Sequence, residues 1–326
     1  MNKVLFSLIY FNESENHLVL DKLLNSSRSD KMAKENKKII TKIISDEIEK
    51  LSSNNLVELR KILRKVFKDR KELSLEIMKT EGDIIYQKNL RLIGFIFLIG
   101  IFFHKSITNK LKIKKEYLLD LKNRLNNTFI EIDVYFDKSM DKQYIELENS
   151  FSSLMRCEKI WDITSEEEND EYKSSADIIL SKEEVKIDIK NIEFIRSTYS
   201  ALHFENKNGG DLYIFPTFIF VDSVNDDIEI LDIRDMSISF KSTINLEYDE
   251  FDIPSDSKII GTTWQYVNKK GGPDKRFSEN YEISEVRYGE LIIQSKSGFF
   301  EEYQFSNVEK AQNFYNAFYS YQQNLK

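Results

Sequence analysis

The chain has 326 residues, room for about two domains, with 41% hydrophobic and 31% charged residues. This composition permits a sizeable buried core and excludes both a disordered chain and a protein with many membrane spans. A single cysteine, Cys157, excludes a disulfide framework and a multi-cysteine zinc site. The three histidines lie far apart in the sequence, so we expect no metal centre and no cofactor.

The first eleven residues contain one lysine and a short apolar run. The run is only about eight residues long, and no small-residue cleavage site follows it. We therefore expect a cytoplasmic rather than a secreted protein.

Charge is distributed unevenly along the chain. Residues 31–115 contain 21 Lys or Arg and 10 Asp or Glu, whereas residues 131–190 contain 17 acidic and 8 basic residues. The basic part favours an anionic partner, either nucleic acid or a membrane surface. The alternatives are that the two parts attract each other or that both are simply solvated.

Glycine and proline mark a change in structure type. All three prolines and seven of the ten glycines follow residue 205. A chain poor in both residues is typical of long helices, and one rich in them is typical of hairpins. We therefore predict an α+β protein with a basic helical region at 1–115 and a mixed to β-rich module at 116–326. Within this module we place a β-rich core at 178–305 and a helix at 307–322.

Two amphipathic helices are predicted first, one with apolar positions from Ile39 to Ile48 and one from Leu56 to Phe67. The second helix carries a basic stripe, which could bind phosphates of nucleic acid or lipid. The stripe consists of Arg60, Lys61, Arg64, Lys65, Lys68 and Lys71.

The segment Leu92–Phe103 is apolar on every side of a helix. Twelve residues span about 18 Å, short of the roughly 30 Å of a bilayer core, which favours a buried or oligomer-forming helix. Basic residues flank it on both sides, so insertion into a membrane or attachment to its surface is the alternative.

The second half alternates like strands, after a strand at Phe129–Phe136 and a helix from Asp141 to Ile160. A terminal hairpin at 291–305 precedes a capping box from Ser306 to Glu309, which opens a last helix with one aromatic face. Strands followed by one amphipathic helix suggest, by analogy, a pleckstrin-homology-like barrel closed by its C-terminal helix.

The block from Thr263 to Asn280 reads Thr-Thr-Trp-x-Tyr-Val-Asn-Lys-x-Gly-Gly-Pro-Asp-x-Arg-Phe-x-x-Asn when Thr262 is included. It resembles the C-terminal module of an uncharacterised bacterial family, over roughly residues 115–326. The resemblance implies a domain boundary near residue 115 but no activity. Its signature residues, expected to be structural or else to form a peptide or lipid headgroup site, are Trp264, Asn268, Asp274, Arg276 and Asn280.

Asp177, Glu184 and Lys186 form the outline of a metal-dependent nuclease core, an acid followed by Glu-x-Lys on a strand. An exposed charged strand gives the same pattern without any chemistry, because Asp188 and Lys190 continue the alternation.

Together these features favour a non-enzymatic interaction or scaffold protein. We expect the N-terminal helices to anchor the chain or form a homo-oligomer, and the C-terminal module to bind a protein partner. An anionic membrane surface is a further possible partner, and nucleic acid ranks below it. One alternative is a metal-dependent nuclease or nucleic-acid-binding effector. Another is a membrane-associated accessory protein of a defence or mobile-element system, attached through Leu92–Phe103.

Overall fold

The computed structural model describes residues 4–11, 43–45, 53–96, 100–168, 178–222, 228–296 and 298–325. The chain forms two compact units, each of which is described by itself. The helical unit comprises Leu5–Val134 and Asn191–Thr198, and the β-rich unit comprises Met1–Val4, Tyr135–Lys190 and Tyr199–Lys326. The boundary that we expected near residue 115 lies within a helix. The α+β class is confirmed.

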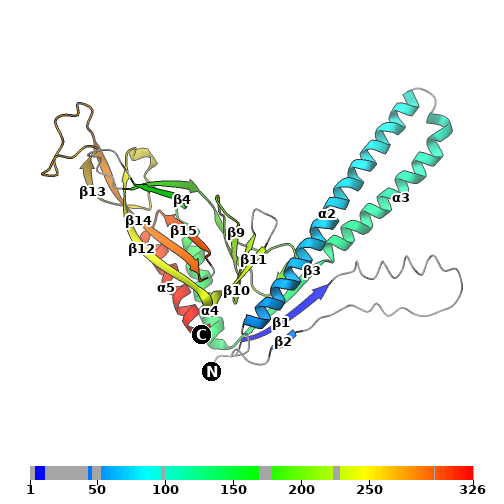
Figure 1. The fold of residues 1–326 in the computed structure, drawn as a ribbon, viewed down its shortest axis with the longest axis horizontal. Coiled ribbons are helices and arrows are strands. Elements are labelled where there is room, and N and C mark those ends of the chain that lie inside the picture. The colour runs from blue at the N-terminus through cyan, green and yellow to red at the C-terminus, as the bar shows by residue number, and fades with distance from the viewer. Residues whose placement is uncertain are drawn as a thin grey trace. The chain divides into compact units, whose positions relative to one another are not determined.

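The helical unit contains two long helices and a small sheet. Its elements are α2 (Ser53–Ile96), α3 (Gly100–Asn126), β1 (Val4–Phe11), β2 (Ile43–Ser45), β3 (Phe129–Phe136) and β7 (Ile195–Ser197). The sheet order is β2-β1-β3-β7, with β3 and β7 parallel and β1 and β2 antiparallel. Figure 1 shows α2 and α3 side by side as an antiparallel hairpin.

One face of α2 holds this hairpin together. Its buried positions recur at intervals of three and four residues or their sums, as in a coiled-coil seam. They are Leu59, Leu63, Val66, Leu73 and Ile84. Leu111 and Leu121 of α3 are buried as well. Ion pairs such as Lys114–Asp83 (2.5 Å) lie at the surface, where they add little, so burial of these apolar side chains stabilises the hairpin.

Arg70 ties α2 to the end of α3. Its Nη1 donates to the carbonyls of Leu125 (2.6 Å) and Thr128 (3.0 Å), and its Nη2 pairs with Glu193 (2.9 Å). The last carbonyls of a helix have no partner within the helix, and a guanidinium satisfies them while opposing the helix dipole.

The predicted helix over Ile39–Ile48 is wrong for the residues that the structure describes there. Ile43–Ser45 is strand β2, and it pairs with β1 so that Leu8 lies opposite Ile43. β-branched isoleucines suit a strand, and an adjacent edge decides between strand and helix. The other residues of that prediction lie outside the described part of the chain.

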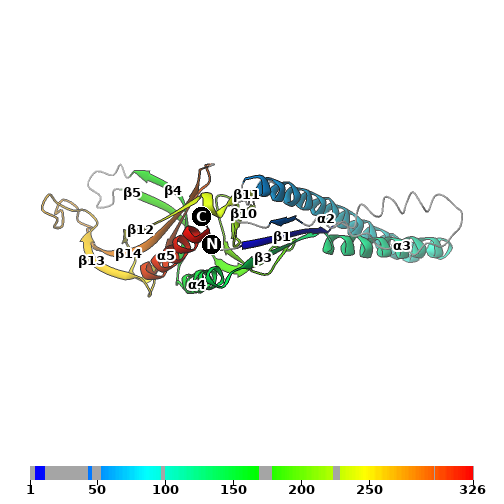
Figure 2. The same ribbon diagram turned by 90° about the horizontal axis from the view of Figure 1, so that it is seen from below.

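The β-rich unit contains two antiparallel sheets and two helices (Figures 1 and 2). The six-stranded sheet has the order β12-β14-β15-β4-β5, with β13 also paired to β14. Its strands are β4 (Ile160–Glu168), β5 (Ile178–Glu184), β12 (Met236–Glu247), β13 (Lys258–Trp264), β14 (Glu282–Ser295) and β15 (Phe300–Phe305). It curls into a half-barrel that packs against α5 (Val308–Leu325).

The five-stranded sheet has the order β11-β10-β9-β8-β6. Its strands are β6 (Ile187–Lys190), β8 (Ala201–Phe204), β9 (Asp211–Ile214), β10 (Phe218–Asp222) and β11 (Ile228–Asp232). Two 3₁₀ turns flank β12, η2 (Ile233–Asp235) before it and η3 (Glu250–Asp252) after it. Helix α4 (Lys138–Leu154) packs against α5, and Phe151 contacts both Phe204 and Phe314.

The last helix begins as predicted, but a different residue caps it. Asn307, rather than Ser306, accepts the backbone N–H of Lys310 through Oδ1 (3.0 Å). Ser306 is buried and its Oγ accepts from the backbone N–H of Lys159 (3.2 Å), so its hydroxyl ties β15 to β4 instead. An asparagine caps a helix as well as a serine does.

Gly289 on β14 allows α5 to approach the sheet closely. A Cβ built on this residue would lie 2.7 Å from the Cβ of Ala311 and 3.1 Å from the Cα of Val308. Both contacts involve groups that cannot rotate away, since one is helix backbone and the other is a Cβ. The helix therefore rests directly on β14 backbone.

We expect Gly289→Ala to lower the free energy of unfolding by about 1–3 kcal/mol, because the added methyl group forces α5 off the sheet. Urea unfolding followed by circular dichroism measures this change. Gly261→Ala is the matched control, since its new Cβ would meet only the mobile end of Glu285. Equal losses in the two variants would contradict this account of Gly289.

Candidate functional site

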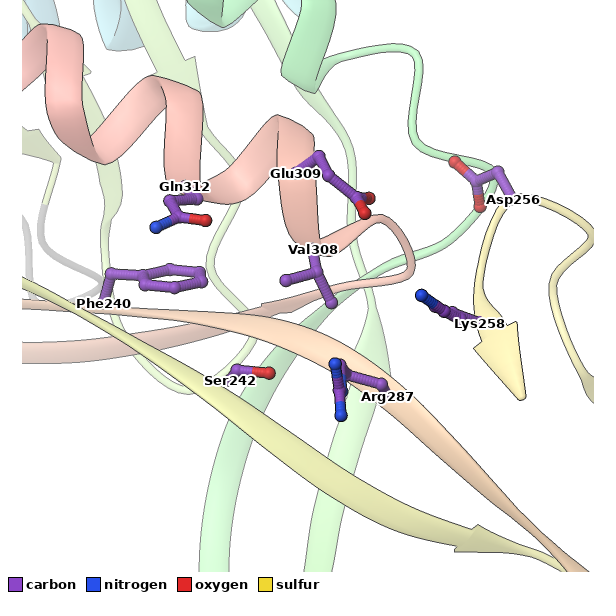
Figure 3. A pocket seen from close by; sticks show the side chains of 8 residues that line it. All are labelled: Phe240, Ser242, Asp256, Lys258, Arg287, Val308, Glu309 and Gln312. Carbon is purple, nitrogen blue, oxygen red and sulfur yellow. The ribbon is translucent and has the colours of Figure 1, made fainter. Parts of the chain in front are cut away.

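A cavity of about 340 Å³ opens beside the first turn of α5 (Figure 3). Strands β12, β13 and β14 supply its floor and one wall, and α5 supplies the other. Its lining consists of Phe240, Ser242, Asp256, Lys258, Arg287, Val308, Glu309 and Gln312. The ring of Phe240 is fixed by packing on Tyr315, with ring centroids 6.2 Å apart.

Two cations face this cavity from neighbouring strands. Lys258 on β13 lies directly opposite Arg287 on β14 in the strand register. Arg287 is on the same face of β14 as Gly289, two residues along, which places it next to the start of α5. Within the described part of the chain, no carboxylate forms an ion pair with Lys258 or Arg287.

Two acids also line the cavity, but they differ in their surroundings. Asp256 is already paired with Lys310 through Oδ2 (3.1 Å). Glu309 is exposed in the first turn of α5, and its carboxylate reaches toward the space between the helix and Lys258 (Figure 3). The cavity therefore combines an opposed cation pair with one exposed carboxylate.

A second polar cluster lies inside the β-rich unit. Asp162 on β4 is fully buried opposite Tyr303 of β15, and its Oδ2 accepts the backbone N–H of Lys207 (2.8 Å). The side-chain ends of Asn206 and Glu301 meet beside Gly209. Asp162 Oδ1, Asn206 Nδ2 and the Tyr303 hydroxyl are buried without a hydrogen-bond partner.

Burial, together with the charge of Asp162, raises the pKa of Glu301 to about 7. Burial likewise raises the pKa of Asp162. Among the described residues no three acidic, histidine or cysteine side chains come together in a way that could hold a metal ion. Because the pKa of Glu301 is about 7, its carboxyl group can hold a proton near neutral pH.

Because the folded state raises the pKa of Glu301, the folded state binds this proton more tightly than the unfolded chain does. The resulting stabilisation is complete below about pH 4.5 and is lost as the pH rises through 7. A fully buried group with this shift would contribute about 3 kcal/mol, and partial exposure reduces the value to about 1–2 kcal/mol.

We expect Glu301→Gln to unfold at a higher denaturant concentration than the wild type at pH 8, and to match it near pH 4.5. Urea unfolding of both proteins across this pH range is the measurement. Glu279→Gln, at an exposed loop position, should follow the wild-type pH profile. A pH profile that Glu301→Gln leaves unchanged would contradict the assignment.

His203 is fixed between two carboxylates. The buried ring places Nδ1 2.6 Å from Asp188 and Nε2 2.9 Å from Asp211, and it packs on Tyr213. Each ring nitrogen therefore already has a carboxylate partner within hydrogen-bond distance. Burial raises the pKa of the Cys157 thiol to about 11, which leaves no thiolate at neutral pH.

A row of exposed apolar side chains runs along the outer face of α2. We call it the α2 outer stripe: Leu75, Met78, Ile85 and Leu92. These side chains are 54%, 66%, 58% and 63% exposed. Gly82 occupies a position between them, and a Cβ built there would meet nothing within 4 Å.

The basic stripe lies nearer the start of α2. Lys61, Arg64, Lys65, Lys68 and Lys71 are exposed and Arg60 is half-buried. Lys68 lies 4.0 Å from Glu72, but its side chain is 76% exposed. The stripe is therefore accessible to an anionic surface.

The module signature residues lie in or beside the connection between β13 and β14: Trp264, Asn268, Asp274, Arg276 and Asn280. Asn280 bonds both backbone groups of Tyr266, donating to its carbonyl (2.8 Å) and accepting from its N–H (2.9 Å). Asn268 donates to a carbonyl across the turn (3.0 Å), and buried Asp274 accepts from Arg276 Nε (2.9 Å). These contacts hold the loop itself in shape.

The predicted nuclease residues are not brought together on one strand. Glu184 ends β5 and Lys186 precedes β6, and both are exposed. Between the two strands Val185 is buried, so Glu184 and Lys186 flank an inward-facing residue and are exposed to solvent. Asp177 lies outside the described residues.

Most side chains of Leu92–Phe103 lie outside the described part of the chain. The prediction of one continuous helix is wrong, since α2 ends at Ile96 and α3 begins at Gly100. Leu92 and Ile93, whose side chains are described, are exposed. Within the described residues, no helix has both the length and the apolar character needed to cross a bilayer.

Comparisons of the chain with models of protein families, with curated proteins and with solved structures find no match. The function therefore has to be argued from the geometry of the residues themselves.

Proposed function

We propose that the protein is a non-enzymatic interaction protein that self-associates through its α2–α3 hairpin and binds a partner with its β-rich module. The α2 outer stripe is the observation that carries the first part. In the module, a curled sheet with a terminal helix supports a pleckstrin-homology-like role as a binding scaffold.

The spacing of the outer stripe supports a helical partner. Leu75, Met78, Gly82, Ile85 and Leu92 follow one another at the three- and four-residue steps of a heptad, or at their sum. The buried face of α2 follows the same steps on the opposite side of the helix. α2 therefore carries two apolar seams, and α3 covers only one of them.

Gly82 supports close approach of that partner. A glycine inside a helix costs about 0.5–1 kcal/mol relative to alanine, and nothing in the hairpin requires its missing side chain. In an antiparallel pair of α2 helices, Ile85 of one copy would lie over Gly82 of the other. A second copy of this chain is therefore the occupant that we assign to the stripe.

We expect the wild-type chain to sediment as a dimer, and Ile85→Glu to raise the dissociation constant by at least about tenfold, because a carboxylate would be buried in the seam. Sedimentation equilibrium measures this change, and circular dichroism reports whether the helices remain. Ile113→Glu is the matched control, since Ile113 on α3 is also exposed (64%) but lies off the stripe.

Gly82→Ala distinguishes a stripe that is buried in a dimer from one that stays exposed to solvent in a monomer. It should weaken association if a second helix approaches, whereas in a monomer it should only stabilise α2 by about 0.5–1 kcal/mol. A monomeric wild type, or equal effects of Ile85→Glu and Ile113→Glu, would refute self-association through this face. A monomer that Ile85→Glu unfolds would instead assign the stripe to another segment of the same chain.

A further inference from the structure

We infer that the cavity beside α5 binds a small phosphate ester that carries hydroxyl groups. This inference rests on the part of the proposed function that assigns binding to the β-rich module, and it names the ligand class.

The first step is the opposed cation pair. Residues directly opposite on antiparallel strands have Cβ atoms about 4.5–5.5 Å apart, and like charges in such a pair destabilise the sheet. Lys258 and Arg287 are in this relation, and no carboxylate in the described chain forms an ion pair with either. A dianionic group bound between them would remove this repulsion, and a guanidinium and an ammonium are the usual side chains that hold phosphate.

The second step is the size and lining of the cavity. About 340 Å³ is at the small end of ligand pockets and exceeds the space that one phosphate group fills. Phe240 supplies an apolar wall, and Ser242 and Gln312 supply groups that can donate or accept. The remainder of the ligand is therefore a short organic group bonded to the phosphate.

The third step is the position of Glu309. A carboxylate accepts hydrogen bonds and would repel phosphate, so it does not belong to the phosphate end of the cavity. Its side chain enters the cavity from α5, whereas Lys258 and Arg287 enter from the sheet (Figure 3). Hydroxyl groups on the ester would donate hydrogen bonds to the Glu309 carboxylate.

Isothermal titration calorimetry on the full chain tests this inference with glycerol 3-phosphate, inorganic phosphate and glycerol as probes. We expect glycerol 3-phosphate to bind at one site and more tightly than inorganic phosphate, and glycerol not to bind. Arg287→Gln and Lys258→Gln should each weaken binding by at least about tenfold, the loss of one charge-assisted contact. Lys275→Gln, at an exposed loop position, should bind like the wild type.

Glu309→Gln tests the orientation of the ligand. It should leave inorganic phosphate bound and shrink the advantage of glycerol 3-phosphate over it. An unchanged advantage would overturn the role of Glu309. If none of the phosphate probes binds, or if Lys275→Gln weakens binding as much as Arg287→Gln does, the inference fails.

The ligand-free variants give a second readout. Because Arg287 faces Lys258, Arg287→Gln should not lower the unfolding midpoint in chloride buffer, and it should remove the midpoint increase that glycerol 3-phosphate gives the wild type. A large loss of stability without ligand would mean that Arg287 is a structural ion, which overturns the proposal. Sedimentation of the same variants separates the two ideas, since dimerisation through α2 does not involve these residues.

Discussion

The contact of α5 with both sheets of the β-rich unit fixes the rest of that unit. At its first turn the helix lies on the backbone of β14 at Gly289. At its other end, Tyr321 donates to the carbonyl of Pro216 (2.7 Å), and Gln322 donates to the carbonyls of Ile233 and Met236 (2.6 Å each). Pro216 lies in the connection before β10, Ile233 in the 3₁₀ turn before β12, and Met236 is the first residue of β12. The side chains of one helix thus satisfy buried backbone carbonyls beside both sheets. These contacts fix the orientation of α5 and with it the wall of the cavity beside its first turn.

β14 makes this arrangement possible because it has different neighbours along its length. It pairs with β12 from Ser284 to Ser295, with β13 over its first half and with β15 over its second half. Gly289 marks the change from one neighbour to the other. The helix therefore covers β14 opposite the end of β15, and it leaves Arg287 open where β13 runs alongside.

Elements whose apolar positions all serve one buried face could be read from the sequence. Strand β3 and helix α5 follow the prediction, and the buried residues of α4 include Tyr144, Leu147 and Phe151 as expected. The predicted end of α4 at Ile160 is wrong, since the helix ends at Leu154 and Ile160 begins strand β4. The prediction failed where pairing with a distant segment decides the outcome. Isoleucines at helical spacing form β2 because β1 offers an edge, and the apolar run after Leu92 divides into the ends of two helices.

Buried polar residues could not be predicted from the sequence for a related reason. Asp162 follows Trp161 in an ordinary strand pattern, and nothing near it indicates that its carboxylate meets Glu301 and Asn206 in the interior. The three come together because β4 pairs with β15 and because the loop before β9 folds over both. The same pairing leaves buried polar atoms of this cluster without a hydrogen-bond partner in the protein. In most proteins buried water molecules bind such atoms.

The candidate site also could not be predicted from the sequence, because it depends on how distant strands pair. Lys258 is one exposed lysine in a strand, and Arg287 is one arginine in another, so neither would attract notice alone. Their meaning depends on register: a slip of one residue between β13 and β14 would move one cation to the opposite face and abolish the pair. The bulge between Ile259 and Gly261 lies immediately beside this pair. Its extra residue shifts the pairing of β13 with β14 and so determines that Lys258 lies opposite Arg287. In a sheet protein without a catalytic motif, a binding site is therefore encoded in pairings rather than in spacing along the chain. An opposed pair of like charges is physically informative because a fold with no use for it would gain stability by losing it.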